Sequence, residues 1–174
     1  MIQTKGTIKS VITNYGLILG GFSVAFALML FLMDMHIEQG SIQGVVNLLI
    51  TSGAIIFGQL AFKKANEGYI SLGQGFKIGL GICVLGSVVG IIYAIIQMTI
   101  LDPDTMSKVM DYSINQAIEQ NPELTDEMID AISDSIEFFS SPSIIAAFSL
   151  ASALFFGSII SLITGLAIKR NKPA

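Results

Sequence analysis

Few side chains in this 174-residue chain could perform acid–base or metal chemistry, and they include only one histidine. Asp34 and Glu38 flank His36 at a spacing of two residues. That spacing matches neither one face of a helix nor a recognised metal-binding pattern. A Ser-His-Asp set needs a histidine held between a nucleophile and a carboxylate, and nothing in the sequence indicates such a set. We therefore expect no catalytic residue, no metal site, no cofactor and no enzymatic activity. We interpret His36 as a cap on the first or second apolar segment, near a membrane surface.

Most carboxylates lie in one segment, residues 102–141, which carries ten acids and a single base, Lys108. Five of these acids form a stripe at helical spacing: Glu123, Glu127, Asp130, Asp134 and Glu137. Calcium prefers about six to eight oxygens that converge in a loop, whereas a linear stripe presents its carboxylates to solvent. We favour a solvated face on helices that cover the membrane domain or lie on the bilayer. A binding face for a protein partner and a divalent-cation site are the alternatives.

The same acidic segment predicts two amphipathic helices. Apolar residues recur at intervals of three and four over residues 106–118 and again over residues 124–139, which is the period of one helical face. Asn121-Pro122-Glu123 predicts the start of the second helix, because Asn caps a helix, Pro suits its first position and Glu suits its positive end. Ser140-Ser141-Pro142 predicts its end.

Three closely spaced glycines, Gly73, Gly75 and Gly79, invite comparison with nucleotide-binding loops. The run lacks the Walker spacing, and its third glycine comes one position late for a dinucleotide-binding loop. We interpret this run as a flexible entry into the third apolar segment.

Four long apolar segments must position these residues, at about 11–33, 42–62, 76–101 and 143–168. Hydrophobic residues make up 52% of the chain and charged residues only 13%, too few to cover a soluble core. Each segment is long enough to cross roughly 30 Å of hydrocarbon as a helix, and the alternating pattern of a barrel strand is missing. The sequence predicts an all-α integral membrane protein with one domain, residues 1–174. Four transmembrane helices are expected, with an extracytoplasmic amphipathic helical hairpin between the third and the fourth.

The basic residues predict the orientation. Eight of the nine lie in the N-terminal tail, in the connection 63–77 or in the C-terminal tail, and only Lys108 lies on the other side. Because Lys and Arg next to spans are retained in the cytoplasm, we expect a multi-pass protein of the bacterial cytoplasmic (inner) membrane with both termini cytoplasmic. The first segment is too long for a signal peptide, so we expect it to remain as a span. The sequence has no basic stripe with interleaved aromatics, so we expect no nucleic-acid binding.

Small residues recur along the predicted spans, where they allow helices to approach closely in lipid. They are Gly16 and Gly20 in the first, Gly75, Gly79, Gly86 and Gly90 in the third, and Ser149, Ala153, Gly157, Ser161 and Gly165 in the fourth. We expect these residues to pack helices within one chain. The alternative is a homo-oligomer interface or a sliding surface.

The polar residues in or near the spans are uncharged and few: Asn14, Asn47, Gln59 and Gln97. No acid or base is expected at mid-membrane, where such groups mark proton relays and ion paths. This disfavours a pump or an ion-coupled transporter. We interpret the four amides as interhelical hydrogen-bonding partners.

The layout resembles an uncharacterised family of small four-span bacterial membrane proteins, a domain of unknown function found mainly in Bacteroidetes. The resemblance depends on Gly68–Gly79 (GYISLGQGFKIG), on Asp102-Pro103 and on the acidic stretch before the last span. It covers nearly the whole chain and implies a membrane location, but it assigns no functional residue. We expect a non-enzymatic scaffold, regulator or accessory subunit that acts through helix association in the bilayer, with a membrane-protein partner or a second copy. The alternative is a small transporter or channel formed by oligomerisation.

Overall fold

The structure, a computed structural model, describes residues 7–37 and 41–172. Its helices are α1 (Ile8–Leu32), α2 (Ser41–Ala65), α3 (Leu72–Ile96), a π-helical turn (Gln97–Leu101), α4 (Thr105–Gln120), α5 (Asp126–Phe139) and α6 (Pro142–Ile168). Over these ranges the chain forms no β-strand, and one antiparallel bridge joins Ile70 to Arg170. The predicted all-α fold is confirmed.

Within the described ranges, four helices are long and apolar enough to cross a membrane: Ile8–Leu32, Ile42–Ala65, Leu72–Leu101 and Pro142–Ile168. Two of them, α1 and α3, begin before the predicted spans because polar residues cap them outside the apolar run. Thr7 accepts a hydrogen bond from the Ser10 N–H at 3.3 Å. Ser71 and Gln74 form a reciprocal capping box that starts α3 four residues earlier than hydropathy indicates. Helix α2 is extended at its other end and continues past Phe62. Its last turn contains Lys63 and Lys64, which suit the negative end of a helix.

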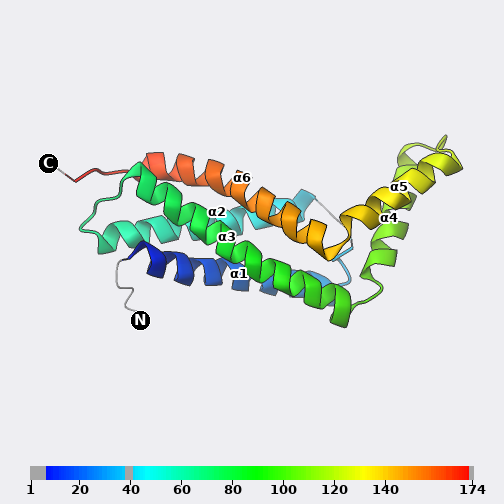
Figure 1. Cartoon of the computed structure of the whole chain (residues 1–174), viewed down its shortest axis with the longest axis horizontal. Coiled ribbons are helices and arrows are strands. Elements are labelled where there is room, and N and C mark those ends of the chain that lie inside the picture. The colour runs from blue at the N-terminus through cyan, green and yellow to red at the C-terminus, as the bar shows by residue number, and fades with distance from the viewer. Residues whose placement is uncertain (1–6, 38–40, 173–174) are drawn as a thin grey trace.

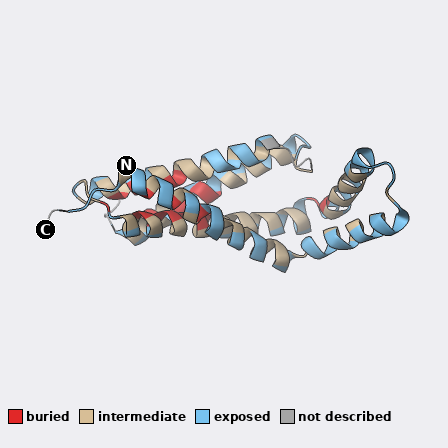
Figure 2. Ribbon diagram, turned by 90° about the horizontal axis from the view of Figure 1, so that it is seen from above, coloured by how far each residue is buried: buried red, intermediate tan, exposed pale blue. Residues whose placement is uncertain are grey.

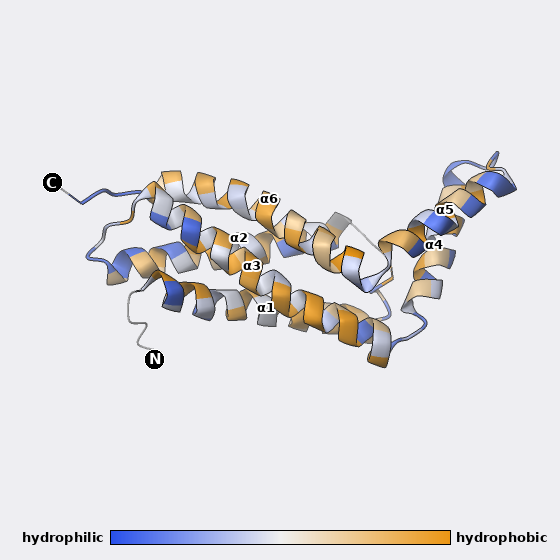
Figure 3. Cartoon of the chain, in the orientation of Figure 1, coloured by the Kyte–Doolittle hydropathy of each residue, from blue (hydrophilic) through white to orange (hydrophobic). Residues whose placement is uncertain are grey.

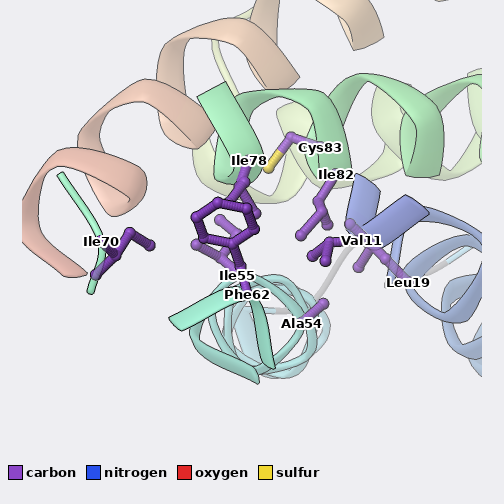
Figure 4. Close-up of a cluster of buried hydrophobic side chains, with 9 residues drawn as sticks. All are labelled: Val11, Leu19, Ala54, Ile55, Phe62, Ile70, Ile78, Ile82 and Cys83. Atoms are coloured by element: carbon purple, nitrogen blue, oxygen red, sulfur yellow. The ribbon is translucent and has the colours of Figure 1, made fainter. Parts of the chain in front are cut away.

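Helix α3 packs on α1, α2 and α6, and we call these four helices the body (Figure 1). The first and last described residues lie at one end of the body, the terminal end, and α4 and α5 project from the other, the hairpin end. Buried residues gather toward the terminal end (Figure 2). Val11, Ile55, Ile78 and Ile82 are fully buried there and form the centre of the apolar core (Figure 4).

Helices α3 and α6 approach closely through small residues. A Cβ atom added to Gly75 would lie 3.3 Å from the Gly165 Cα. A Cβ atom on Gly157 would lie 2.8 Å from the Cys83 Sγ and 2.9 Å from its Cβ, and one on Gly79 would overlap Ser161. Close backbone approach of this kind increases dispersion contact between helices in lipid.

Glycines also receive side chains where α1 packs on α3. The Leu85 side chain covers Gly16 and Val89 covers Gly20, and a Cβ atom on either glycine would come within 2.8 Å of its neighbour. In the opposite direction, Leu19 of α1 covers Gly86 of α3. The two helices therefore interdigitate over about one and a half turns.

Large apolar side chains face outward over much of the body, including Phe22, Ile42, Leu49, Phe57, Phe155 and Ile163. Hydrophilic residues concentrate at the ends of the body and on the hairpin (Figure 3). An apolar surface of this extent requires a lipid environment. The chain is a multi-pass membrane protein.

Contacts at the terminal end join the chain's distant segments. The Ile70 and Arg170 backbones exchange two hydrogen bonds of 2.9 Å. The Lys63 Nζ donates to the Ile168 carbonyl at 2.8 Å, next to the end of α6. These contacts join α2 and the α2–α3 connection to the C-terminal residues.

The predicted start of the second hairpin helix at Asn121-Pro122-Glu123 is wrong. Helix α4 ends at Gln120, and the chain then makes a turn in which the Leu124 N–H donates to the Asn121 carbonyl. Helix α5 begins at Asp126, with Thr125 in the extended N-cap conformation and Asp126 and Glu127 in its first turn. The acids of the first turn suit the positive end of α5, while the Asn121 Oδ1 accepts a hydrogen bond from the Glu123 N–H at 3.3 Å within the turn instead of capping a helix. The predicted end at Ser140-Ser141 is confirmed.

We expect Gly157→Leu to destabilise the protein by about 1–3 kcal/mol, because the new side chain would force α6 away from Cys83. Gly21→Leu is the matched control, since a Cβ atom there meets nothing within 4 Å. Thermal unfolding in mild detergent measures both. Equal midpoints for the two variants would contradict the observed α3–α6 packing.

Candidate functional site

A cleft opens in the body on the hairpin side of the core. It has a volume of about 570 Å³ and is lined by residues of all four long helices. Its polar lining consists of hydroxyl and amide side chains: Ser23, Asn47, Thr51, Ser87, Tyr93, Gln97, Ser149 and Ser152. Of the residues that the structure describes, no acidic or basic one lines this cleft. The cleft is therefore a neutral, hydrogen-bonding surface inside the membrane-spanning part of the chain.

The cleft exists because small residues continue along α3 and α6 beyond the point where the helices touch. Gly90 lies in its wall, and a Cβ atom there meets nothing within 4 Å. Ser149 and Ala153, which continue the stripe of Gly157, also line it. Small residues thus allow α3 and α6 to touch near the termini, but near the hairpin they line an open space.

Nearer the termini than the cleft, a buried amide, Gln59, joins three helices. Its Nε2 donates to the carbonyls of Gly75 at 3.0 Å and Ser161 at 3.3 Å, so that α2 is joined to α3 and α6. The expected interhelical role of the membrane amides thus matches the position of Gln59. Asn47 and Gln97 lie instead in the cleft wall.

Tyr93 differs from the other polar groups of the cleft. Its hydroxyl oxygen is buried but has no hydrogen-bonding partner among the described residues. By contrast, the Ser87 hydroxyl donates to the Val84 carbonyl of its own helix at 2.9 Å. A buried hydroxyl without a partner costs free energy in an apolar medium, so Tyr93 provides unused hydrogen-bonding capacity.

A second cavity of about 550 Å³, the vestibule, lies between the body and the hairpin. His36, Thr105, Ser135 and Ser140 are among its lining residues. Ala94 and Gln97 line both cavities, so the vestibule adjoins the cleft.

The π-helical turn begins at this junction. The Asp102 N–H donates to the Gln97 carbonyl at 2.8 Å, which widens the last turn of the span. Such turns are rare and occur often at functional sites. Here the turn begins at the one polar residue that lines both cavities.

An ionic cluster at the hairpin end joins three parts of the chain. The buried Asp102 carboxylate accepts two hydrogen bonds from the Lys108 Nζ, at 2.8 and 2.9 Å. The His36 Nε2 lies 3.2 Å from the same carboxylate, and its ring packs edge-on against Phe31. The α1–α2 connection, the end of α3 and the first turn of α4 therefore meet at one residue.

The interaction with Lys108 is the largest cause of a low Asp102 pKa, about 2. Burial opposes this shift, and the hydrogen bond with His36 adds to it. The same interaction raises the Lys108 pKa. The cluster was not predicted from sequence. One feature of the sequence could have pointed to this cluster: the only histidine and the only base of the acidic segment are both residue types that pair with carboxylates.

The remaining predicted site residues lie apart from the cleft. Glu127, Asp130, Asp134 and Glu137 are exposed on α5, and Glu123 lies in the turn before that helix. Over the described ranges, no group of three or more His, Cys, Asp or Glu side chains is arranged to hold a metal ion.

A family model described as "Protein of unknown function (DUF4199)" matches residues 14–170. The chain belongs to the DUF4199 family. The resemblance to an uncharacterised membrane family is confirmed. No curated protein and no solved structure matches the chain. The DUF4199 match runs from within α1 to the residue after Lys169, so it includes the cleft, the ionic cluster and the hairpin.

We expect Asp102→Asn to lower the thermal midpoint at neutral pH. The folded-state pKa of Asp102 lies below its unfolded value of about 3.9, so its stabilisation is complete above about pH 4 and is lost between pH 4 and about 2. The difference in midpoint between wild type and variant should therefore disappear near pH 2. A difference that is constant from pH 7 to pH 2 would contradict this role for the carboxylate.

Proposed function

We propose that this DUF4199 protein is a non-enzymatic protein of the bacterial cytoplasmic membrane that acts as a scaffold, regulator or accessory subunit. The orientation rests on the basic residues. Seven of those described lie toward the terminal end, and Lys108 lies at the hairpin end. The positive-inside rule then puts the termini in the cytoplasm and the hairpin outside.

The hairpin is the element that we assign to partner binding. Met128 and Phe138 of α5, and its last residue Phe139, are about half or more exposed, although this helix lies beyond the membrane spans. Helices α4 and α5 splay apart, and a cavity of about 310 Å³ opens between their bases, beside Met110 and Ile136. Exposed apolar residues on a polar helix favour an association surface, and this observation carries the proposal.

Charge indicates the kind of partner. The segment 102–141 has ten acids and one base, and its α5 carboxylates are exposed. This charge disfavours anionic lipid headgroups, and it also disfavours two hairpins meeting face to face. The proposed partner is a different protein with basic residues around an apolar patch.

Site-specific crosslinking in intact cells tests this proposal. Cys83 is the only cysteine, so single cysteines at Met128 and Glu119 can be placed in a Cys83→Ala background and modified with a photoreactive probe. Met128 lies on the apolar side of α5, whereas Glu119 is an exposed acid on α4 and serves as the control. We expect an adduct with one other protein from position 128 and not from position 119.

Charge reversal tests whether the acidic face of α5 contributes to binding the partner. Asp130→Lys combined with Asp134→Lys should reduce that adduct at least several-fold, because both side chains lie on the acidic face of α5. Adducts at twice the mass of the chain, or equal adducts from both positions, would contradict the proposed partner.

A small transporter or channel formed by oligomerisation is the second candidate, and the cleft is the observation that favours it. Within one chain the cleft ends at the apolar core, whose residues Leu19 and Cys83 belong to its lining. A continuous path would therefore require more than one copy. Solute flux in vesicles that contain the purified protein, reduced by Gly90→Phe in the cleft wall, would favour this candidate over the scaffold.

A further inference from the structure

We propose that the cleft is a binding site for one neutral, lipid-like amphiphile. Its hydroxyl, ester or amide group would contact Tyr93 and Gln97, and its single hydrocarbon chain would lie along the apolar part of the wall. This inference is independent of the partner proposed for the hairpin.

No charged side chain is among the lining residues in the described part of the chain, and this favours a ligand with a neutral headgroup. The polar lining consists of serines, one threonine, one tyrosine and two amides. A phosphate or carboxylate buried there would lack a cationic partner, which is costly in a low-dielectric medium. A neutral group that both donates and accepts hydrogen bonds matches these side chains.

Tyr93 supplies a specific anchor. Its hydroxyl group is buried without a partner among the described residues, and the Tyr93 side chain is part of the cleft wall. Gln97 lies four residues further along the chain, at the start of the π-helical turn and at the junction with the vestibule. Together they place hydrogen-bonding groups near the mouth of the cleft, with Leu19, Cys83 and Gly157 further from the hairpin.

The size of the cleft selects a small ligand rather than a helix. One turn of an α-helix about 10 Å wide and 5.4 Å long occupies about 420 Å³. A cleft of about 570 Å³ therefore holds little more than one turn and cannot receive a spanning helix of a partner. Pockets of about 300–1,000 Å³ with a mostly apolar wall and a few polar groups are typical of small-molecule sites.

The position of the cleft next to lipid agrees with an amphiphile as its ligand. The lining includes Asn47, Thr51, Ser149 and Ser152, which belong to the hairpin-side halves of α2 and α6. On the same part of α2, Val45, Leu48 and Leu49 are at least half exposed and therefore face lipid. An amphiphile could thus enter from the surrounding membrane.

Photolabelling in lipid nanodiscs tests the proposal. The probes are a diazirine-bearing monoacylglycerol, which is neutral, and the fatty acid of equal chain length, which is anionic; unlabelled glycerol is a competitor. Labelled residues are located by peptide mass spectrometry. We expect the monoacylglycerol to label cleft residues such as Ser87 and Ser152 at least tenfold more than the fatty acid does. Glycerol should not compete.

Two variants and a matched control connect the signal to the cleft. Gly90→Phe fills the cleft without a clash at Cβ and should reduce labelling about tenfold. Gly21→Phe makes the same change at an exposed position and should leave labelling unchanged. Tyr93→Phe preserves the shape of the wall and should reduce labelling roughly fivefold, as expected for the loss of one hydrogen bond.

Several results would overturn the proposal. Preferential labelling by the fatty acid would exclude a neutral headgroup, and competition by glycerol would indicate a site for polar solutes. Labelling of the cleft residues that is equal in wild type and Gly90→Phe, or absent from these residues, would exclude the cleft as an amphiphile site.

Discussion

The close approach of α3 to α1 and α6 is the constraint on which the rest of the structure depends. Apolar burial cannot drive helix association in lipid, so contact between backbones must supply much of the attraction. Gly75 and Gly79 of α3 meet Gly165 and Ser161 of α6, while Leu85 and Leu19 interdigitate with glycines across the α1–α3 contact. Gln59 adds hydrogen bonds from α2 at the same level. The terminal half of the body is therefore tightly packed.

The hairpin half follows a different arrangement, although its residues are of the same type. Gly90 and Ala153 continue the small-residue stripes, yet they line a cleft. The ionic cluster of His36, Asp102 and Lys108 holds the ends of the helices beyond the cleft. At the hairpin end, this cluster joins the α1–α2 connection to the end of α3 and to α4, while the cleft stays open beside it. This arrangement places neutral polar groups inside the membrane-spanning part of the chain, including the Tyr93 hydroxyl, which has no partner among the residues described.

Much of this fold could be predicted from the sequence, because hydropathy and helical period are local properties. The four apolar helices and two amphipathic helices required no knowledge of tertiary contacts. Local signals failed where two competed, as when Thr125 and Asp126 began α5 in place of Asn121. The cleft could not be predicted, since identical glycines either contact a neighbour or line a cavity. The pairing of His36 with Asp102 joins residues 66 positions apart, which no local pattern reveals.

Accessibility of single cysteines tests most directly whether the body is closed near the termini and open toward the hairpin. In a Cys83→Ala background, Ser152→Cys places a thiol in the cleft wall and Ala54→Cys places one in the core. A membrane-impermeant maleimide is added to intact spheroplasts. The account predicts modification at position 152 and protection at position 54. Protection of both thiols, or modification of position 152 only from the cytoplasmic side of inverted vesicles, would contradict it.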